Sequence, residues 1–239
     1  METKNEENIR FSERYLLFGI DREQIENLIK EHELNYKRVG IRINDDEGEP
    51  TVELSSSEQK YLTKARKRFV EIFSDYLFFP PNRTLAEAFF ETLEKRNLQV
   101  STAESVTGGM IASRILDQPG ASKIMKEAFV VYSNQAKMDL LGINPKTIQK
   151  YGVVSEEVAS EMADRLQNVS GANIAIATTG IAGPDGGTEN IPVGTVFFGF
   201  VITKDKSTER KQFSGDRNEI RKKATAYAMA YVINRLNNK

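Results

Sequence analysis

Four stretches of the sequence contain residue types that could do chemistry. The first, Ala-Glu-Ser-Val-Thr-Gly-Gly at 103–109, places Ser105 where a strand is expected to turn into a helix. The serine hydroxyl then lies beside the free backbone N–H groups of Thr107, Gly108 and Gly109. Those donors, together with the helix N-terminus, could stabilise the oxyanion of an acyl-transfer reaction. Because serine and threonine also cap helices, this stretch alone fits either a catalytic or a capping interpretation.

The second stretch, Tyr-Ser-Asn-Gln-Ala-Lys at 132–137, offers a candidate base. Tyr132 is expected to end a strand, and Lys137 to lie in the first turns of the helix that follows. A lysine accepts a proton only when it is neutral, and burial in apolar surroundings lowers its pKa toward working pH. Tyr132 could bridge the proton transfer or orient Ser105. From these residues alone, a surface lysine beside a half-buried tyrosine is the simpler interpretation.

The third stretch, 179–188, is rich in glycine and leaves the end of an expected strand. Glycines at this density let the backbone approach a ligand closely, and α/β domains usually bind ligands at the carboxyl ends of strands. No Gly-Lys-Ser/Thr follows, so the stretch is not a Walker loop. A plain flexible loop is the alternative to a binding loop. The candidate ligand-binding residues here are Thr179, Gly180, Gly183, Gly186 and Gly187.

The fourth stretch, Phe-Ser-Gly-Asp-Arg at 213–217, opens the last expected helix. Asp216 fits a helix cap, and Arg217 could reach a phosphate group.

Composition narrows this chemistry. The 239 residues include no cysteine and a single histidine, His32, which stands between two glutamates and is expected to be a solvated surface residue. The absence of cysteine excludes disulfides, thiolate nucleophiles and Cys-ligated metals. A Ser-His-Asp triad in the C-terminal part and most zinc sites are also excluded. A hydrolase of this composition must use lysine, tyrosine, a carboxylate or an oxygen-ligated metal.

Charge and hydropathy set limits on partners and location. The formal net charge is −1, so nucleic acid is not expected as a partner. No apolar run approaches the roughly 18 residues that a membrane span needs. The first ten residues are polar and acidic, unlike a secretory or transit peptide. We therefore expect a cytoplasmic protein without a membrane partner.

The elements that must position the four stretches alternate between helix and strand, which indicates a three-layer α/β/α domain with a mixed sheet. A Pro-Pro pair in the stretch 79–82 marks its beginning, so we expect this domain at 83–239. Ser155 is expected to cap one of its helices. The expected helices are 84–96, 108–116, 134–141, one from 156 and 218–236, and the expected strands are 99–103, 129–132, 174–179, 193–202 and 209–213.

Residues 1–82 are expected to form a small α+β module. The expected elements are a strand at 15–20, a helix at 22–30, a strand at 37–44, a turn at 45–49, a strand at 51–54 and a helix that Ser57 caps and that ends near 73. This order is similar to a KH module, but the Gly-x-x-Gly loop that clamps a nucleic-acid backbone is absent. A structural or interface role is therefore favoured.

The order and the residue sequences of the four stretches, with Gly-Val-Val-Ser-Glu-Glu-Val at 152–158, resemble the CinA C-terminal domain family, the nicotinamide-nucleotide amidohydrolases or NMN deamidases. The resemblance covers residues from about 85 to 236. Residues from about 10 to 80 look like the KH-like linker that precedes this domain in full-length members. We expect no molybdopterin-binding-like domain, and hence no metal-dependent pyrophosphatase activity.

The resemblance implies hydrolysis of nicotinamide mononucleotide to nicotinate mononucleotide and ammonia, without a metal or cofactor. It maps the nucleophile onto Ser105 and its partners onto Tyr132 and Lys137, and it implies a homodimer. Val106 departs from many members, which carry cysteine after the serine. The residues implied to bind substrate are Thr107, Gly108, Gly109, Thr179, Gly180, Gly183, Gly186, Gly187 and Arg217. The alternative is a non-catalytic nucleotide-binding or protein-interaction module of the same family.

Overall fold

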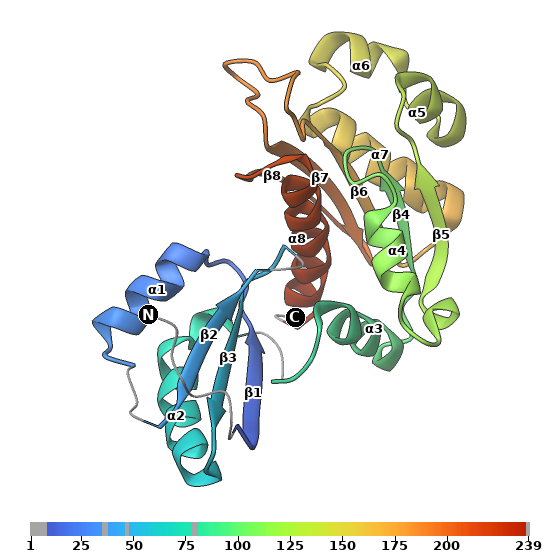
Figure 1. Ribbon diagram of the computed structural model, residues 1–239. Coiled ribbons are helices and arrows are strands. Elements are labelled where there is room, and N and C mark those ends of the chain that lie inside the picture. The colour runs from blue at the N-terminus through green and yellow to red at the C-terminus, as the bar shows by residue number, and fades with distance from the viewer. Residues whose placement is uncertain (1–8, 35–37, 46–47, 78–80, 238–239) are drawn as a thin grey trace. The chain divides into compact units, whose positions relative to one another are not determined.

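The computed structural model describes residues 9–34, 38–45, 48–77 and 81–237 (Figure 1). The chain divides into two compact units, Met1–Thr84 and Leu85–Lys239. In the residues described, no helix is both long enough and apolar enough to cross a membrane.

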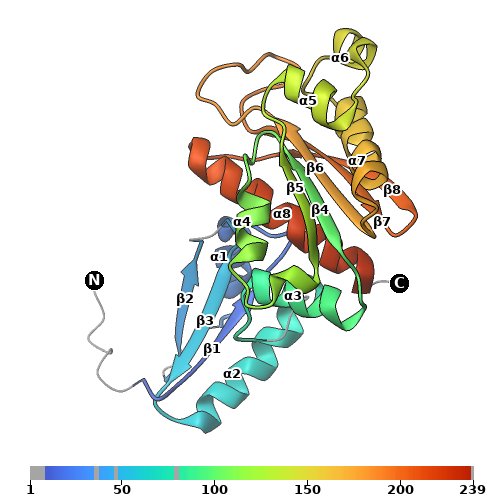
Figure 2. The ribbon, with the colours of Figure 1, turned by 90° about the vertical axis from the view of Figure 1, so that its right-hand side faces the viewer.

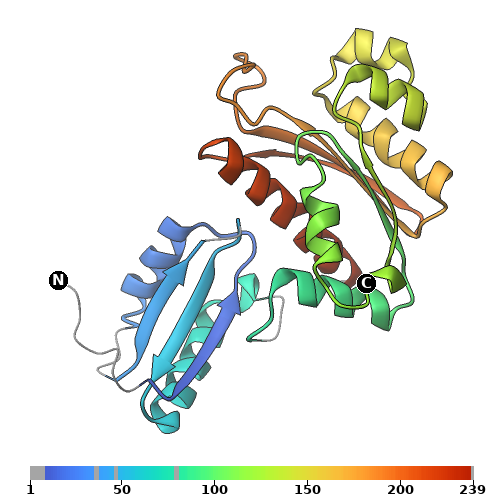
Figure 3. The ribbon, with the colours of Figure 1, turned by 45° about the vertical axis from the view of Figure 1, so that its right-hand side comes forward.

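The N-terminal unit is a three-stranded antiparallel sheet with two helices. The strands β1 (Phe11–Leu16), β2 (Gly40–Asn44) and β3 (Thr51–Ser56) lie in the order β1-β3-β2. Val52 and Leu54 on β3 share a core with residues of both α1 (Arg22–Glu31) and α2 (Gln59–Ile72), so both helices cover the same face of the sheet (Figure 3). A short 3-10 helix, η2 (Ser74–Tyr76), follows α2. The predicted order of strand, helix, two strands and helix is confirmed.

Two predictions for this unit are wrong in detail. The strand expected at 15–20 is β1, which ends at Leu16, because the backbone turns at Gly19 (φ +82°) toward the Asp21 cap of α1. Ser57 does not cap α2, because β3 runs on to Ser56 and the cap position falls to Glu58. The predicted β2–β3 hairpin is confirmed, although β2 begins at Gly40. Residue 37 of the expected strand and residues 46–47 of the expected turn lie outside the described residues.

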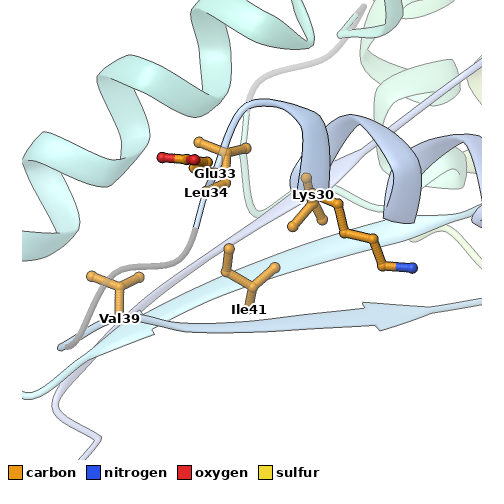
Figure 4. Close-up of a pocket in the computed structure, with 6 residues that line it drawn as sticks. Lys30, Glu33, Leu34, Val39 and Ile41 are labelled. Carbon is orange, nitrogen blue, oxygen red and sulfur yellow. The ribbon is translucent and has the colours of Figure 1, made fainter.

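A cavity of about 670 Å³ lies between the end of α1 and β2 in this unit. Aliphatic side chains form most of its lining, and Lys30 and Glu33 extend in opposite directions at its ends (Figure 4).

The C-terminal unit has a five-stranded sheet in the order β5-β4-β6-β7-β8. Its strands are β4 (Val100–Glu104), β5 (Met125–Val130), β6 (Ile174–Gly180), β7 (Thr195–Ile202) and β8 (Asp205–Gln212). β4, β5 and β6 run parallel, whereas β7 pairs antiparallel with both β6 and β8. The predicted mixed sheet is therefore confirmed.

Helices cover both faces of this sheet, as Figure 2 shows. One face carries α3 (Leu85–Lys95), α4 (Met110–Leu116) and α8 (Arg217–Asn237), and the other carries α5 (Asn134–Leu141), α6 (Pro145–Tyr151) and α7 (Glu156–Ser170). Successive residues of β7 face opposite sides of the sheet. Phe200 stacks on Tyr231 of α8, with ring centroids 4.3 Å apart. Its neighbour Gly199 packs so closely on Ala159 of α7 that a Cβ would not fit. The predicted three layers are confirmed.

Several boundaries in this unit differ from prediction. β5 begins at Met125 and ends at Val130, so Tyr132 lies beyond the strand that it was expected to end. α4 begins at Met110, because Gly108 and Gly109 have positive φ angles of 61° and 92°. β8 starts four residues earlier than expected, at Asp205. Helix α6 was not predicted, since seven residues are too few for a clear period.

The topology brings three loops to one edge of the sheet. Glu104 at the end of β4 pairs with Val130 of β5 on one side and with Thr178 of β6 on the other. The segments that follow these three parallel strands therefore leave the sheet together, where α/β domains place their sites. The segments after β4, β5 and β6 contain the first three predicted stretches.

Candidate active site

Ser105 is the first residue after β4, and the segment around it is tied to β6. Its N–H donates to the carbonyl oxygen of Thr178 at 3.0 Å. Two residues later, the hydroxyl of Thr107 lies 2.8 Å from that of Thr178, and both side chains are buried. Ser105 itself is 9% exposed, so its hydroxyl lies at the edge of the interior.

Lys137 reaches Ser105 from α5. The side chain of Ser133 caps this helix by accepting from the N–H of Ala136. Lys137 is 1% exposed, and its Nζ lies 2.9 Å from Ser105 Oγ. It also donates to the carbonyl oxygens of Val131 at 2.8 Å and Tyr132 at 3.3 Å. Burial lowers the pKa of Lys137 to about 8.

Tyr132 contributes its backbone to this contact. Its carbonyl oxygen accepts from Lys137, while its side chain is 67% exposed at the rim of the cavity described below. In the described part of the chain, no hydrogen bond joins its hydroxyl to Ser105 or to Lys137. The structure thus brings Ser105 and Lys137 into contact, and it leaves the Tyr132 hydroxyl apart from them.

Glu104 is a buried residue of this site that sequence reasoning missed. Its carboxylate accepts the N–H groups of Gly109 at 2.9 Å, Ile111 at 3.0 Å and Ala112 at 2.9 Å. The first N–H groups of α4 are therefore already bonded, and the prediction that this helix N-terminus would stabilise an oxyanion is wrong. An acid at the end of a buried strand, a few residues before a helix, is the signal that could have identified it.

Arg221, on α8, was also missed. Its Nε donates to the carbonyl oxygen of Val106 at 3.1 Å, and its Nη2 donates to that of Thr107 at 2.9 Å. The residues that it holds lie 115 and 114 positions earlier in the chain. No local pattern indicates such a contact.

A cavity of about 300 Å³ opens beside Ser105 and Lys137. Of the predicted binding residues, Thr179, Gly180, Gly183 and Arg217 line it, whereas Thr107, Gly108, Gly109, Gly186 and Gly187 do not. The lining residues that were not predicted are Val106, Asn134, Val153, Val154, Ile181, Ala182 and Asp185. The volume is at the lower end of the ~300–1,000 Å³ range of small-ligand sites.

The wall of this cavity is built from close backbone contacts. Thr179 donates its hydroxyl to the carbonyl oxygen of Val153 at 2.9 Å. A Cβ at Gly180 would lie 2.6 Å from the carbonyl oxygen of Thr195, so only glycine fits there. Arg217 donates Nη1 to the carbonyl oxygen of Gly183 at 2.8 Å, which links α8 to the loop after β6. The prediction that Asp216 caps α8 is confirmed, because it accepts from the N–H of Glu219 at 2.9 Å.

Gly187 has a packing role, because a Cβ there would lie 2.8 Å from the backbone nitrogen of Val193.

Among the described residues, no three His, Asp or Glu side chains gather in a way that could hold a metal ion.

Comparison with known families gives a match to the CinA C-terminal domain over residues 82–236. A CinA-like protein of Kosmotoga olearia is 35% identical over 230 residues, which cover 94% of this chain and 56% of that protein. A putative competence-damage inducible protein of Acetivibrio thermocellus is 34% identical over 219 residues, covering 89% of this chain and 53% of that protein. The chain thus spans about half the length of these curated relatives.

Solved structures match about two thirds of the chain. A CinA superfamily protein of Klebsiella pneumoniae has 32% identity and a TM-score of 0.63, over 65% of this chain and 97% of that one. The competence/damage inducible protein CihA of Agrobacterium tumefaciens has 37% identity and a TM-score of 0.61, over 64% and 93%.

Proposed function

Because the chain belongs to the family of the CinA C-terminal domain, we propose that it hydrolyses the carboxamide of nicotinamide mononucleotide to nicotinate mononucleotide and ammonia. Ser105 is the nucleophile and Lys137 the base. The observation that carries this proposal is the 2.9 Å contact between Lys137 Nζ and Ser105 Oγ, made by a buried lysine.

The partners of Lys137 suit it to act as a base. A neutral amine has two N–H bonds and one lone pair. The carbonyl oxygens of Val131 and Tyr132 are placed to accept the two N–H bonds, at 2.8 Å and 3.3 Å. The lone pair then faces Ser105 Oγ, from which it can take a proton. No carboxylate bonds to the amine among the described residues, so no ion pair there offsets the lowering of its pKa by burial.

The reaction proceeds in two steps through a covalent intermediate. Ser105 Oγ attacks the amide carbon while its proton passes to Lys137, and the carbonyl oxygen becomes an oxyanion. The ammonium of Lys137 returns the proton to the amide nitrogen, the C–N bond breaks and ammonia leaves. A water molecule then gives a proton to Lys137 and attacks the carbonyl carbon of the acyl-enzyme. The bond from that carbon to Ser105 Oγ breaks, the ammonium of Lys137 returns the proton to Oγ, and the acid leaves and ionises to nicotinate mononucleotide.

The cavity supports binding of the rest of the nucleotide. Arg217 lines it and uses Nη1 on Gly183, so its remaining N–H bonds are the natural donors for the ribose phosphate. The loop from Thr179 to Gly183 would hold the nucleotide against Ser105. The Tyr132 hydroxyl would act only after its exposed side chain swings toward Ser105.

Release of ammonia from nicotinamide mononucleotide by the purified protein tests the proposal. The assay contains a chelator, and Ser105→Ala and Lys137→Met run beside the wild type. Release that both substitutions abolish would support a serine amidase that needs no metal. A folded wild type that binds the nucleotide without releasing ammonia would instead favour a non-catalytic nucleotide-binding module.

A further inference from the structure

The backbone around Ser105 offers few donors for an oxyanion. Glu104 already accepts the N–H groups of Gly109, Ile111 and Ala112. In the described part of the C-terminal unit, no hydrogen bond uses the N–H groups of the three residues directly after Ser105, which are Val106, Thr107 and Gly108. Directly after Ser105, the N–H groups without a partner therefore lie in this short segment and not at the start of α4.

Arg221 determines which way this segment faces. Its guanidinium binds the carbonyl oxygens of Val106 and Thr107, at 3.1 Å and 2.9 Å. In a planar trans peptide, the N–H points opposite to the C=O of the same peptide unit. The N–H groups of Thr107 and Gly108 belong to these two units, so both point away from Arg221. Successive N–H groups that point to one side form an anion-binding concavity.

The guanidinium lies outside the cavity. Val106 lines the cavity beside Ser105, whereas Thr107, Gly108 and Arg221 do not, so the segment that Arg221 holds begins at the cavity wall and runs away from it. Gly108 has φ +61°, and a Cβ there would lie 3.0 Å from Arg221 Nη2, so the glycine leaves room for the guanidinium. The hydroxyl of Thr107 is fixed on Thr178 at 2.8 Å, which limits rotation of the segment.

We infer that Arg221 is a positioning residue of the proposed amidase: it holds the carbonyl groups of Val106 and Thr107 so that the N–H groups of Thr107 and Gly108 form the oxyanion site. The inference rests on the proposed function. The planar fork of arginine can bind two carbonyl groups at once, which the single ammonium of lysine does less well.

Steady-state hydrolysis of nicotinamide mononucleotide by Arg221→Met and Arg221→Lys tests this. The oxyanion exists only during reaction, so Arg221→Met should lower kcat by at least about 10-fold while KM changes less than about 2-fold. Arg221→Lys should recover part of the loss. The pH midpoint of kcat should stay that of the wild type, since Lys137 is untouched. Arg235→Met, which removes an exposed arginine from the same helix, is the matched control and should behave as wild type.

A second measurement separates this inference from the choice of substrate. Diisopropyl fluorophosphate phosphorylates a serine: the Oγ–P bond forms, the P–F bond breaks, the proton passes to Lys137 and fluoride leaves. Its phosphoryl oxygen needs the same N–H donors, but the probe needs no nucleotide pocket. Labelling of Ser105, followed by intact mass, should be at least about 10-fold slower in Arg221→Met.

A wild type that is labelled but releases no ammonia would overturn the proposed substrate, and the labelling rates would then decide the inference. Equal kcat and equal labelling rates in wild type and Arg221→Met would overturn the positioning role. If Arg221→Met loses its thermal unfolding transition, Arg221→Lys takes its place in the comparison. Wild-type kcat and wild-type labelling rates in Arg221→Lys would then overturn the positioning role. A wild type that resists labelling at Ser105 would also overturn it.

Discussion

The amine of Lys137 is held 2.8 Å from the backbone carbonyl oxygen of Val131, and both residues are almost completely buried. This contact fixes the position of the amine without an ion pair that would favour its charged form, because a carbonyl group carries no net charge. A carboxylate at the same place would favour the ammonium and keep the amine protonated. The chemistry that we propose therefore depends on backbone partners around the lysine as much as on the lysine itself.

The proposed base makes the reaction pH-dependent. Burial lowers the pKa of Lys137 to about 8, and only the neutral amine can take a proton. We expect kcat/KM for nicotinamide mononucleotide to rise with pH and to level off above about 8. Lys137→Arg should abolish turnover at every pH, because arginine stays protonated. A rate that is flat between pH 6 and 9 would contradict the assignment of Lys137 as the base.

The same pKa predicts a stability effect. The folded-state pKa lies below the unfolded value of ~10.4, so between pH 8 and 10 the unfolded chain binds the extra proton and stability rises with pH. Relative to Lys137→Met, the wild type should gain up to about 1.4 kcal/mol per pH unit over that window, and nothing below pH 7. Urea unfolding at pH 6, 8, 9 and 10 measures this. A difference that does not change with pH would show that the lysine keeps its ordinary pKa.

Glu104 should stabilise the folded state. Its two oxygens accept three backbone N–H groups, whereas a glutamine has one oxygen and a donor amide that would face those N–H groups. We expect Glu104→Gln to lower the free energy of unfolding by about 1–3 kcal/mol. Glu189→Gln, at an exposed position, is the matched control and should have no effect. Equal stability of the two variants would rule out this role.

Tyr132 should matter less than Lys137. Its hydroxyl makes no hydrogen bond to Ser105 or Lys137 within the described residues, and its side chain is 67% exposed. We expect Tyr132→Phe to lower kcat by less than about 10-fold, and Lys137→Met by the 10²–10⁴-fold typical of a lost general base. A loss in Tyr132→Phe as large as that in Lys137→Met would show that the hydroxyl swings into the site during turnover.

Sequence patterns predicted this site unevenly. The spacing around Lys137 predicted helix α5 at its observed bounds, because Ser133 is a strong cap and Gly142 ends the helix. The pairing of Lys137 with Ser105 came from the family resemblance alone, since the residues around Lys137 favoured a surface lysine; in the structure, β4 and β5 are parallel and their ends bring the two residues together. Arg221 could not be predicted, because it binds backbone carbonyl groups, which every residue type has. Glu104 was missed because a buried carboxylate with only backbone partners is rare.

Arg217 provides a test of how the phosphate is bound. It lines the cavity, and only its Nη1 is bonded to Gly183, at 2.8 Å. If its other N–H bonds hold the phosphate, Arg217→Met should raise KM for nicotinamide mononucleotide by about 10-fold, the value of one charge-assisted pair. The same variant should leave KM unchanged for nicotinamide riboside, which has no phosphate. Steady-state kinetics with both substrates decides between two roles. An equal rise in both KM values would mean that Arg217 acts by holding the carbonyl of Gly183 and shaping the loop, and not by contacting the phosphate.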